Sequence, residues 1–239
     1  MIGFQYKEYS PTACSVFSHD LPSVQLRRKP RQSRAKQTQQ ALLDSVVRLL
    51  QQQSPAQLTI REITELAGVG LGTFYEYFAQ KEDLLAWVIH QQIIQHAEAL
   101  RSYTQPPLQL STTGDICSDI LTLLRFQLDR IRSEQRLWAS VFLLERSLSS
   151  EQAYQKHYQL MLDSWQQILS RYTPETRERL RCAENLHRIS YGFISQTLLI
   201  QPTFQDWPQL QADIELAIQP FLARLISTKS DQNTQKSKL

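Results

Sequence analysis

Residues 59–78, TIREITELAGVGLGTFYEYF, decide the fold of this chain. They open on a capping box, in which the hydroxyl of Thr59 can accept from the backbone N–H of Glu62 while the glutamate side chain reaches back. A short helix is expected to follow. Its inward face is predicted to carry Ile60, Ile63 and Leu66. Gly68 is placed to end this helix, because glycine adopts the left-handed conformation without strain.

A second short helix is expected after a tight turn, over residues 71–77. Gly70 can serve as a weak N-terminal cap. Phe74 and Phe78 lie four residues apart, so both can face inward. Two short helices joined by a turn that contains glycine form a helix-turn-helix, whose second helix can enter the major groove of DNA. The stretch therefore predicts a unit that reads DNA.

Longer helices are expected on both sides of this unit. Apolar residues recur at helical spacing from Leu42 to Leu50, which predicts an amphipathic helix over 36–52 that Ser54-Pro55 ends. Another helix is expected to start near Lys81, with acids in its first turn that complement the helix dipole, and to run to about Arg101.

The rest of the chain also shows helical periodicity. Residues 102–114 are interpreted as a linker. Five more helices are expected over 115–133, 136–148, 151–172, 175–200 and 209–226. The third of these should have an inward stripe from Tyr154 to Tyr172, and Pro220 should kink the last. With only 6 glycines in 239 residues, the sequence predicts an all-α fold.

A basic segment directly precedes the first helix. Six of the ten residues from Arg27 to Lys36 are basic and no acid interrupts them, although the net charge of the whole chain is only +3. Such an arm suits a polyanion, because each neutralised phosphate releases counterions. The alternative is a solvated, disordered tail. Residues 1–35 lack a sustained period and are expected to be an extension that ends in this arm.

The residues after Leu58 resemble the DNA-binding domain of the TetR family of repressors. The resemblance rests on four runs: Thr59-Ile60-Arg61-Glu62-Ile63, Ala67-Gly68-Val69, Gly72-Thr73-Phe74-Tyr75-Glu76-Tyr77-Phe78 and Lys81-Glu82-Asp83-Leu84. It covers about residues 37–90. Two positions depart from the usual pattern, because Gly70 stands where a serine cap is common and Thr64 where alanine is common.

The resemblance implies a division of the chain into functional parts. Three helices would hold the DNA, a fourth would connect them onward, and a C-terminal helical domain would dimerise and usually hold an inducer. We therefore expect an extension at 1–35, a helix-turn-helix domain at 36–82, a ligand-binding and dimerisation domain at 83–227, and a polar tail at 228–239. Helices 184–200 and 209–226 match the family's dimerisation pair in position, and Gly192 would allow two helices to approach closely.

The DNA-facing residues are predicted from position and chemistry together. Leu71 could contact a thymine methyl, Gly72 would allow a close approach to DNA, and Thr73 could reach a base or a phosphate. Tyrosine hydroxyls and a lysine beside a helix N-terminus suit phosphates. The complete predicted set is Thr59, Arg61, Leu71, Gly72, Thr73, Tyr75, Tyr77 and Lys81. Phe74 and Phe78 are expected to be core residues.

The C-terminal half contains many large aromatic residues but no recognisable catalytic set. Its histidines form no metal-binding or protease pattern, and there is neither a glycine-rich phosphate loop nor a nucleophile elbow. We therefore expect no enzyme, no cofactor and no metal. Aromatic residues can line an apolar pocket between helices, and the candidates are Phe126, Trp138, Phe142, Tyr158 and Trp165. A cationic ligand could use their faces, with Glu145 or Asp163 as a candidate acidic partner.

Together these features predict a sequence-specific transcriptional regulator. The expected partners are double-stranded DNA with a palindromic operator, a second copy of the chain, and an apolar or aromatic inducer. Three widely spaced cysteines and the absence of a signal-peptide pattern or an apolar stretch of spanning length fit a cytoplasmic protein with no membrane anchor. The alternatives are a DNA-binding protein controlled by a protein partner instead of an inducer, and a helical enzyme with an incidental helix-turn-helix.

Overall fold

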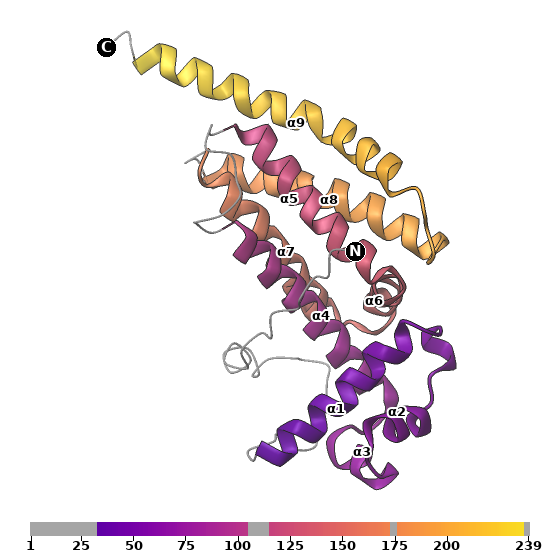
Figure 1. Cartoon of the computed structure of the whole chain (residues 1–239). Coiled ribbons are helices and arrows are strands. Elements are labelled where there is room, and N and C mark those ends of the chain that lie inside the picture. Colours follow the sequence, from indigo (N-terminus) through magenta and orange to yellow (C-terminus); the bar gives the residue numbers. More distant parts are fainter. Residues whose placement is uncertain (1–32, 105–114, 173–175, 237–239) are drawn as a thin grey trace.

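The computed structural model describes residues 33–104, 115–172 and 176–236, and the regular elements within these ranges are helical (Figure 1). The elements are α1 (Ser33–Leu50), the short 3-10 helix η2 (Pro55–Gln57), α2 (Ile60–Ala67), α3 (Leu71–Tyr77), α4 (Lys81–Tyr103), α5 (Ile116–Ser133), α6 (Gln135–Leu148), α7 (Glu151–Leu169), α8 (Thr176–Ile200) and α9 (Trp207–Lys236). The predicted all-α fold is confirmed.

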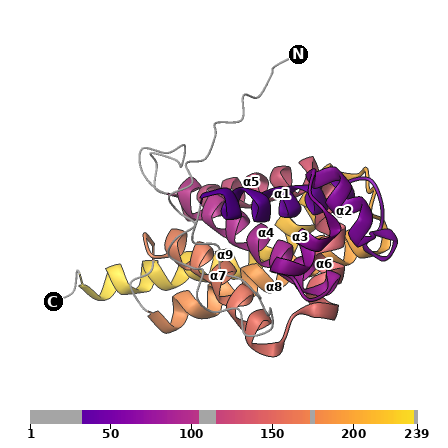
Figure 2. The ribbon, with the colours of Figure 1, turned by 90° about the horizontal axis from the view of Figure 1, so that it is seen from below.

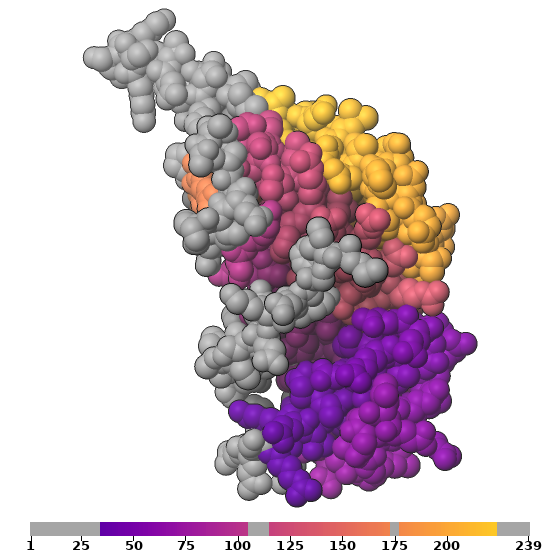
Figure 3. Space-filling view, viewed as in Figure 1, coloured from indigo at the N-terminus to yellow at the C-terminus, as the bar shows by residue number. Residues whose placement is uncertain are grey.

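Helices α1, α2 and α3 form a small N-terminal lobe, which the space-filling view separates from the larger body of the molecule (Figure 3). The lobe has a core because each helix contributes large apolar side chains that solvent does not reach. Its fully or nearly fully buried residues are Leu42, Val46, Leu50, Leu58, Ile63, Phe74, Tyr77 and Phe78. The rings of Phe74 and Phe78 lie 5.7 Å apart at the centre of this core.

The two ends of α2 have the predicted local structure. The backbone N–H of Glu62 donates to the Thr59 hydroxyl at 3.2 Å, and the backbone N–H of Thr59 donates to the Glu62 carboxylate at 2.9 Å. Gly68 ends the helix at φ +68° and ψ +30°, in the left-handed region that glycine favours. The capping box and the glycine stop thus fix α2 at eight residues.

The prediction that Leu66 faces inward is wrong, because its side chain is 45% exposed. At 100° per residue, Ile63 and Thr64 lie near the centre of the buried face, and Leu66 lies roughly 110° away from that centre. The polar Thr64 can occupy the inner face because its hydroxyl donates to the carbonyl of Arg61 at 2.9 Å. The departure from alanine at this position is therefore accommodated within the helix itself.

Helix α4 joins the two parts of the molecule (Figures 1 and 2). Its first residue, Lys81, donates from Nζ to the carbonyl oxygen of Leu58 at 2.8 Å, which ties the helix to the segment just before α2. Its apolar side chains, from Leu84 to Leu100, are buried against both lobes. A second link joins α1 to the α5–α6 junction, where the Gln51 amide donates to the Glu134 carboxylate at 3.4 Å.

Helices α5 to α9 form the C-terminal lobe, with α4 packed against α6 and α7 and with α9 lying over α5 and α8 (Figure 1). Side chains cap two of these helices: Asp115 accepts from the first-turn N–H groups of α5, and Ser150 accepts from that of Ala153 in α7. The indole of Trp207 donates to Gln135 at 3.1 Å, which fixes the start of α9 against α6.

Several helix boundaries differ from the prediction. Helix α7 ends at Leu169 instead of 172, and Tyr154, expected on its inward stripe, is 40% exposed. Helix α9 continues through Pro220 as one element and reaches Lys236, beyond the expected end at 226. No glycine or further proline stands between Pro220 and Lys236 to stop it. Residues 1–32, which hold most of the predicted basic arm, lie outside the described residues.

Two further findings concern the described part of the chain. None of the helices there combines the length and the apolar character needed to cross a membrane. No three histidine, cysteine, aspartate or glutamate side chains gather there in an arrangement that could hold a metal ion.

Candidate DNA-binding surface and ligand pocket

Helix α3 presents one face to the core and the opposite face to solvent. Phe74 anchors the inner face, while Leu71, Gly72 and Tyr75 are exposed. Leu71, the first residue of the helix, is 53% exposed. A Cβ placed on Gly72 would meet no atom of the chain within 4 Å, so the protein itself does not require glycine there. The exposed end of α3 thus has the position that base contact would need.

Thr59 and Arg61 lie at the start of α2 and are both exposed. The hydroxyl of Thr59 donates to the Glu62 carboxylate at 2.7 Å, and these hydrogen bonds from Thr59 lower the pKa of Glu62. Arg61 pairs with Glu65 at 2.8 Å, with 86% of the arginine side chain exposed. Such an exposed pair contributes little stability, so Arg61 remains available to a phosphate.

Tyr77 and Lys81 differ in setting from the other predicted DNA-facing residues. Tyr77 is only 3% exposed and its ring belongs to the core of the N-terminal lobe, which leaves at most its hydroxyl for the predicted contact with a phosphate. The reason is helical spacing, because Tyr77 lies three residues after the buried Phe74. Lys81 already donates to the carbonyl of Leu58, and its ammonium has two further protons to offer.

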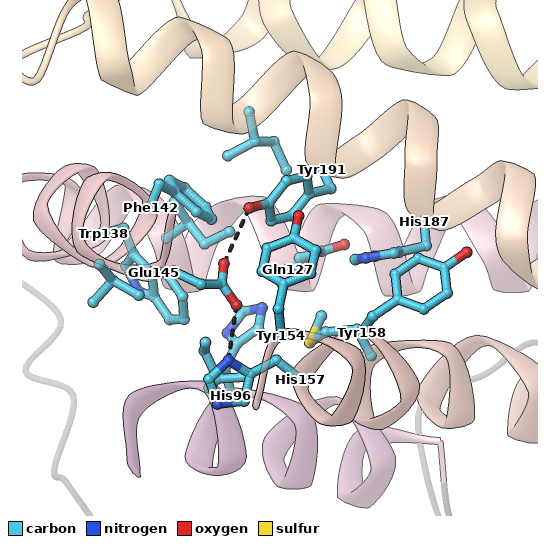
Figure 4. Close-up of a pocket in the computed structure, with 15 residues that line it drawn as sticks. His96, Gln127, Trp138, Phe142, Glu145, Tyr154, His157, Tyr158, His187 and Tyr191 are labelled. Atoms are coloured by element: carbon cyan, nitrogen blue, oxygen red, sulfur yellow. Dashed lines mark hydrogen bonds and ion pairs between the residues drawn. The ribbon is translucent and has the colours of Figure 1, made fainter. Parts of the chain in front are cut away.

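A pocket lies between α4, α5, α6, α7 and α8; the space free of protein atoms there, open solvent included, is about 540 Å³, of which about 40 Å³ admits the centre of a water molecule. Its walls are apolar and aromatic with several polar groups, which is the usual chemistry of a site for a small organic molecule. The lining residues are Ile93, His96, Gln127, Ile131, Trp138, Val141, Phe142, Glu145, Tyr154, His157, Tyr158, Met161, His187, Tyr191 and Ile194. Figure 4 shows their side chains converging from these helices.

The pocket brings together three of the five predicted ligand residues, namely Trp138, Phe142 and Tyr158. Phe126 does not line it, because its ring stacks on Tyr103 with 4.0 Å between ring centroids. Trp165 is not among the lining residues either, and its side chain is buried in the core. The prediction that Phe126 and Trp165 contact the ligand is therefore wrong for this pocket. Sequence spacing places both residues on buried faces but does not say which buried faces surround empty space.

A hydrogen-bonded chain of polar side chains crosses the pocket wall. The Glu145 carboxylate, 4% exposed, accepts from Nδ1 of His157 at 2.9 Å and from the Tyr191 hydroxyl at 3.0 Å (Figure 4). Nε2 of His157 lies 3.0 Å from Nδ1 of His90, which stands on α4. Burial and the neighbouring Glu145 raise the pKa of Tyr191, so its hydroxyl keeps its proton and donates.

Three other polar side chains reach the pocket without a hydrogen-bond partner for the atoms concerned. The atoms without a partner are both ring nitrogens of His96, Nδ1 of His187 and Oε1 of Gln127. All three residues are buried. Burial lowers the pKa of His96 to about 3 and that of His187 to about 4, so both rings are neutral at neutral pH. Buried polar groups without partners are destabilising, and a ligand that supplies partners would relieve that penalty.

Most of the polar lining residues were not predicted from the sequence. Glu145 was named only as a candidate partner for a cation, and no histidine was among the predicted ligand residues. A usable signal was present, because Trp138, Phe142 and Glu145 follow the i, i+4, i+7 spacing of one helix face. A carboxylate at the end of an aromatic stripe is expected to be buried with the stripe. A buried acid is rarely found without a partner, so it points to a polar site.

The geometry defines a class of protein, namely a helix-turn-helix DNA-binding protein with a separate pocket in a helical domain. Residues 42–88 match the family described as "Bacterial regulatory proteins, tetR family". The search of curated proteins finds no match. Residues 42–88 therefore carry a DNA-binding domain of the tetR-family type, and the fold of the chain is similar to that of solved TetR-family regulators.

Solved structures with the same fold cover most of the chain. A putative TetR-family regulator from Mesorhizobium loti matches with a TM-score of 0.63 at 15% identity, over 80% of this chain and 98% of that one. SmeT, the repressor of the multidrug efflux pump SmeDEF of Stenotrophomonas maltophilia, gives 0.57 at 20%, over 79% and 91%. SmeT has also been solved with triclosan. FadR from Bacillus subtilis, in complex with stearoyl-CoA, gives 0.58 at 17%, over 75% and 97%.

Proposed function

We propose that this chain is a cytoplasmic repressor that binds a palindromic operator as a homodimer and releases it when a small apolar or aromatic molecule enters the pocket. The observation that carries the proposal is the dual role of α4. Its first residue is bonded to the helix-turn-helix lobe through Leu58, and its Ile93 and His96 line the pocket. A ligand that changes the position of α4 would therefore change the position of α3.

The direct link between α4 and the opposite wall of the pocket supports this coupling. His90 of α4 is bonded to His157 of α7, and His157 is bonded to Glu145 of α6. A ligand that displaces the α6 or α7 wall thus acts on α4 through a hydrogen bond as well as through packing. A ligand shifts the operator-binding equilibrium only by its difference in affinity for the two states, and this bond is a place where such a difference can arise.

Dimerisation is proposed through α8 and α9. Their outer faces expose apolar side chains, among them Phe193 and Ile200 of α8 and Leu216 of α9, which are 38%, 77% and 67% exposed. On α9 the exposed positions Ala212, Leu216, Pro220 and Ala223 follow helical spacing and form one apolar stripe. A Cβ on Gly192 would meet nothing within 4 Å, which leaves room for a partner helix. Two copies would then present two α3 helices to a two-fold operator.

The alternative, a regulator controlled by a protein partner, would be favoured by a solid core in place of the pocket. The cavity and its unpartnered polar groups support the inducer instead. The DNA-facing set remains part of the proposal: Thr59, Arg61, Leu71, Gly72, Thr73, Tyr75 and Lys81, with Tyr77 contributing at most its hydroxyl.

Selection of bound DNA from a random pool tests the DNA-binding half of the proposal. We expect a palindromic sequence with half-sites spaced by about one helical turn or a multiple of it. Titration of the selected operator against a panel of aromatic molecules then tests the inducer half. A selected site without two-fold symmetry would contradict the dimer, and an operator affinity that no pocket-binding molecule changes would contradict induced release.

A further inference from the structure

The lining of the pocket holds an acid, while the Arg146 guanidinium lies outside the lining, over the ring of Tyr191 at 5.4 Å. Among the described residues that line the pocket, Glu145 is the single acid, and there is neither a lysine nor an arginine. An acid in such a place is costly unless it is paired and hydrogen-bonded, because a charge loses its hydration on burial. The partners of Glu145 therefore decide whether its negative charge remains for a ligand to meet.

Each carboxylate oxygen of Glu145 accepts one hydrogen bond. Tyr191 donates its hydroxyl proton, and His157 donates from Nδ1. Nε2 of His157 lies 3.0 Å from Nδ1 of His90, so the chain of hydrogen bonds continues from Glu145 to α4. Burial lowers the pKa of His90 to about 4, which agrees with a neutral ring. Glu145 is the one acid of this hydrogen-bonded chain.

The carboxylate has acceptor capacity left after these two bonds. Each ionised carboxylate offers about four lone-pair sites, and the structure uses one on each oxygen of Glu145. In Figure 4 the carboxylate of Glu145 lies among the drawn side chains, with Trp138 and Phe142 on one side and Tyr154 on the other. A donor group on a ligand could thus reach a lone pair while its body contacts aromatic faces.

The aromatic walls favour the same kind of ligand. The rings of Trp138 and Phe142 are 5.6 Å apart, and Phe142 meets Tyr191 edge to face at 5.4 Å. Aromatic faces attract cations, and the attraction is strongest where water is excluded. The unpartnered nitrogens of His96 indicate that the ligand has polar atoms, so a plain hydrocarbon would leave them unsatisfied.

We infer that the pocket selects an organic amine that is protonated at neutral pH, with a flat apolar body between the aromatic walls and its ammonium group at Glu145. Glu145 is the specificity-determining residue of this site, because a buried carboxylate attracts a cation and repels an anion of the same shape. The inference rests on the proposed function in taking this pocket as the inducer site. It goes beyond that function by assigning a charge class to the inducer.

Three compounds with one ring system test the inference on the wild-type full chain: 1-naphthylmethylamine as the cation, 1-naphthylmethanol as the neutral form and 1-naphthoate as the anion. Isothermal titration calorimetry at pH 7 should give the order amine, alcohol, acid, with the amine bound at least about tenfold more tightly than the alcohol. Equal affinities, or tightest binding of the acid, would overturn the inference.

Two matched variants show whether Glu145 is the cause. Glu145→Gln keeps an acceptor for His157 but removes the charge, so the preference for the amine over the alcohol should disappear while the affinity for the alcohol stays within about twofold. Asp163→Asn removes a carboxylate from the same region that lies outside the pocket lining and is bonded to Gln159, and it should leave the preference unchanged. A preference that survives in Glu145→Gln would overturn the inference even if the wild-type order holds.

Operator release by the same compounds separates this inference from the proposed function. If all three compounds bind equally and release the operator, the inducer site stands and the charge class is wrong. If the amine is preferred through Glu145 but operator affinity does not change, the charge class stands and the inducer role is wrong. If none of the three binds, the charge class is wrong, and the inducer role is decided by the titration of the operator against the wider panel of aromatic molecules.

Discussion

Replacement of Gly72 by alanine should stabilise the protein and weaken its hold on DNA. Gly72 lies in the first turn of α3, and a Cβ there would meet no atom of the chain within 4 Å. Alanine in a helix is more stable than glycine by about 0.5–1 kcal/mol, because glycine loses more conformational freedom on folding. For a chain of this size, that gain corresponds to a rise in Tm of roughly 1–4 °C.

The loss on DNA has a different origin. If α3 lies in the major groove with its N-terminal end toward the bases, the added methyl group occupies space that the DNA needs. We expect an operator affinity lower by about tenfold, which is about 1.4 kcal/mol. Differential scanning calorimetry measures the first effect, and titration of the selected operator measures the second.

Gly68→Ala is the matched control, because its stability effect should have the opposite sign. Gly68 has φ +68° and also has open space around it, so alanine meets no clash but must adopt the left-handed conformation. That conformation costs an L-residue about 1–2 kcal/mol, so the Tm should fall by roughly 2–8 °C. If Gly72→Ala raised the Tm and left operator affinity unchanged, Gly72 would not face DNA, and the proposed docking of α3 would be refuted.

Three further changes test other parts of the structure. Lys81→Ala should weaken binding to all DNA sequences and reduce the slope of log affinity against log salt concentration by about one. An unchanged slope would show that Lys81 contacts no phosphate and acts only through its bond to the carbonyl of Leu58. Phe74→Ala should destabilise the N-terminal lobe by about 3–5 kcal/mol in urea unfolding, since the ring is fully buried, and a loss below about 1 kcal/mol would contradict its place in the core. Burial lowers the pKa of His90, His96 and His187 to about 4, 3 and 4, so between about pH 6.5 and pH 4 the unfolded chain binds more protons than the folded chain. The contribution of these neutral histidines to stability is therefore complete above pH 6.5 and is lost as the pH falls through this window. The free energy of unfolding falls by up to about 1.4 kcal/mol per pH unit for each histidine. Equal free energies of unfolding at pH 7 and pH 5 would contradict the burial of these rings.

The N-terminal lobe could be predicted because its signals are local. A capping box, a glycine stop and two phenylalanines four residues apart are all read within twenty residues, and each has the predicted role in the structure. Leu66 was misplaced, and the burial of the Tyr77 ring was not predicted, because the face of a short helix is set by its neighbours, and a shift of 100° moves a residue between core and surface.

The pocket could be predicted only in part because its walls come from five helices that are far apart in the sequence. Periodicity shows that Trp165 and Trp138 are both on buried faces, but one fills the core and the other borders the cavity. The bond between His90 and His157 joins residues that are 67 positions apart, and no pattern along the chain announces it. The bond exists because α4 packs against α7.

The unbroken course of α4 has a geometric consequence. The stretch from Lys81 to His96 is about 22 Å long at 1.5 Å per residue, and it belongs to one continuous helix. A tilt of about 5° around the pocket end would therefore displace the other end by about 2 Å, which is more than the tolerance of a hydrogen bond to a base edge. In a dimer, the two displacements would add to or subtract from the separation of the α3 helices, while the DNA keeps its own repeat of about 34 Å. A movement too small to disturb the packing around the ligand would then suffice to put both half-sites out of register.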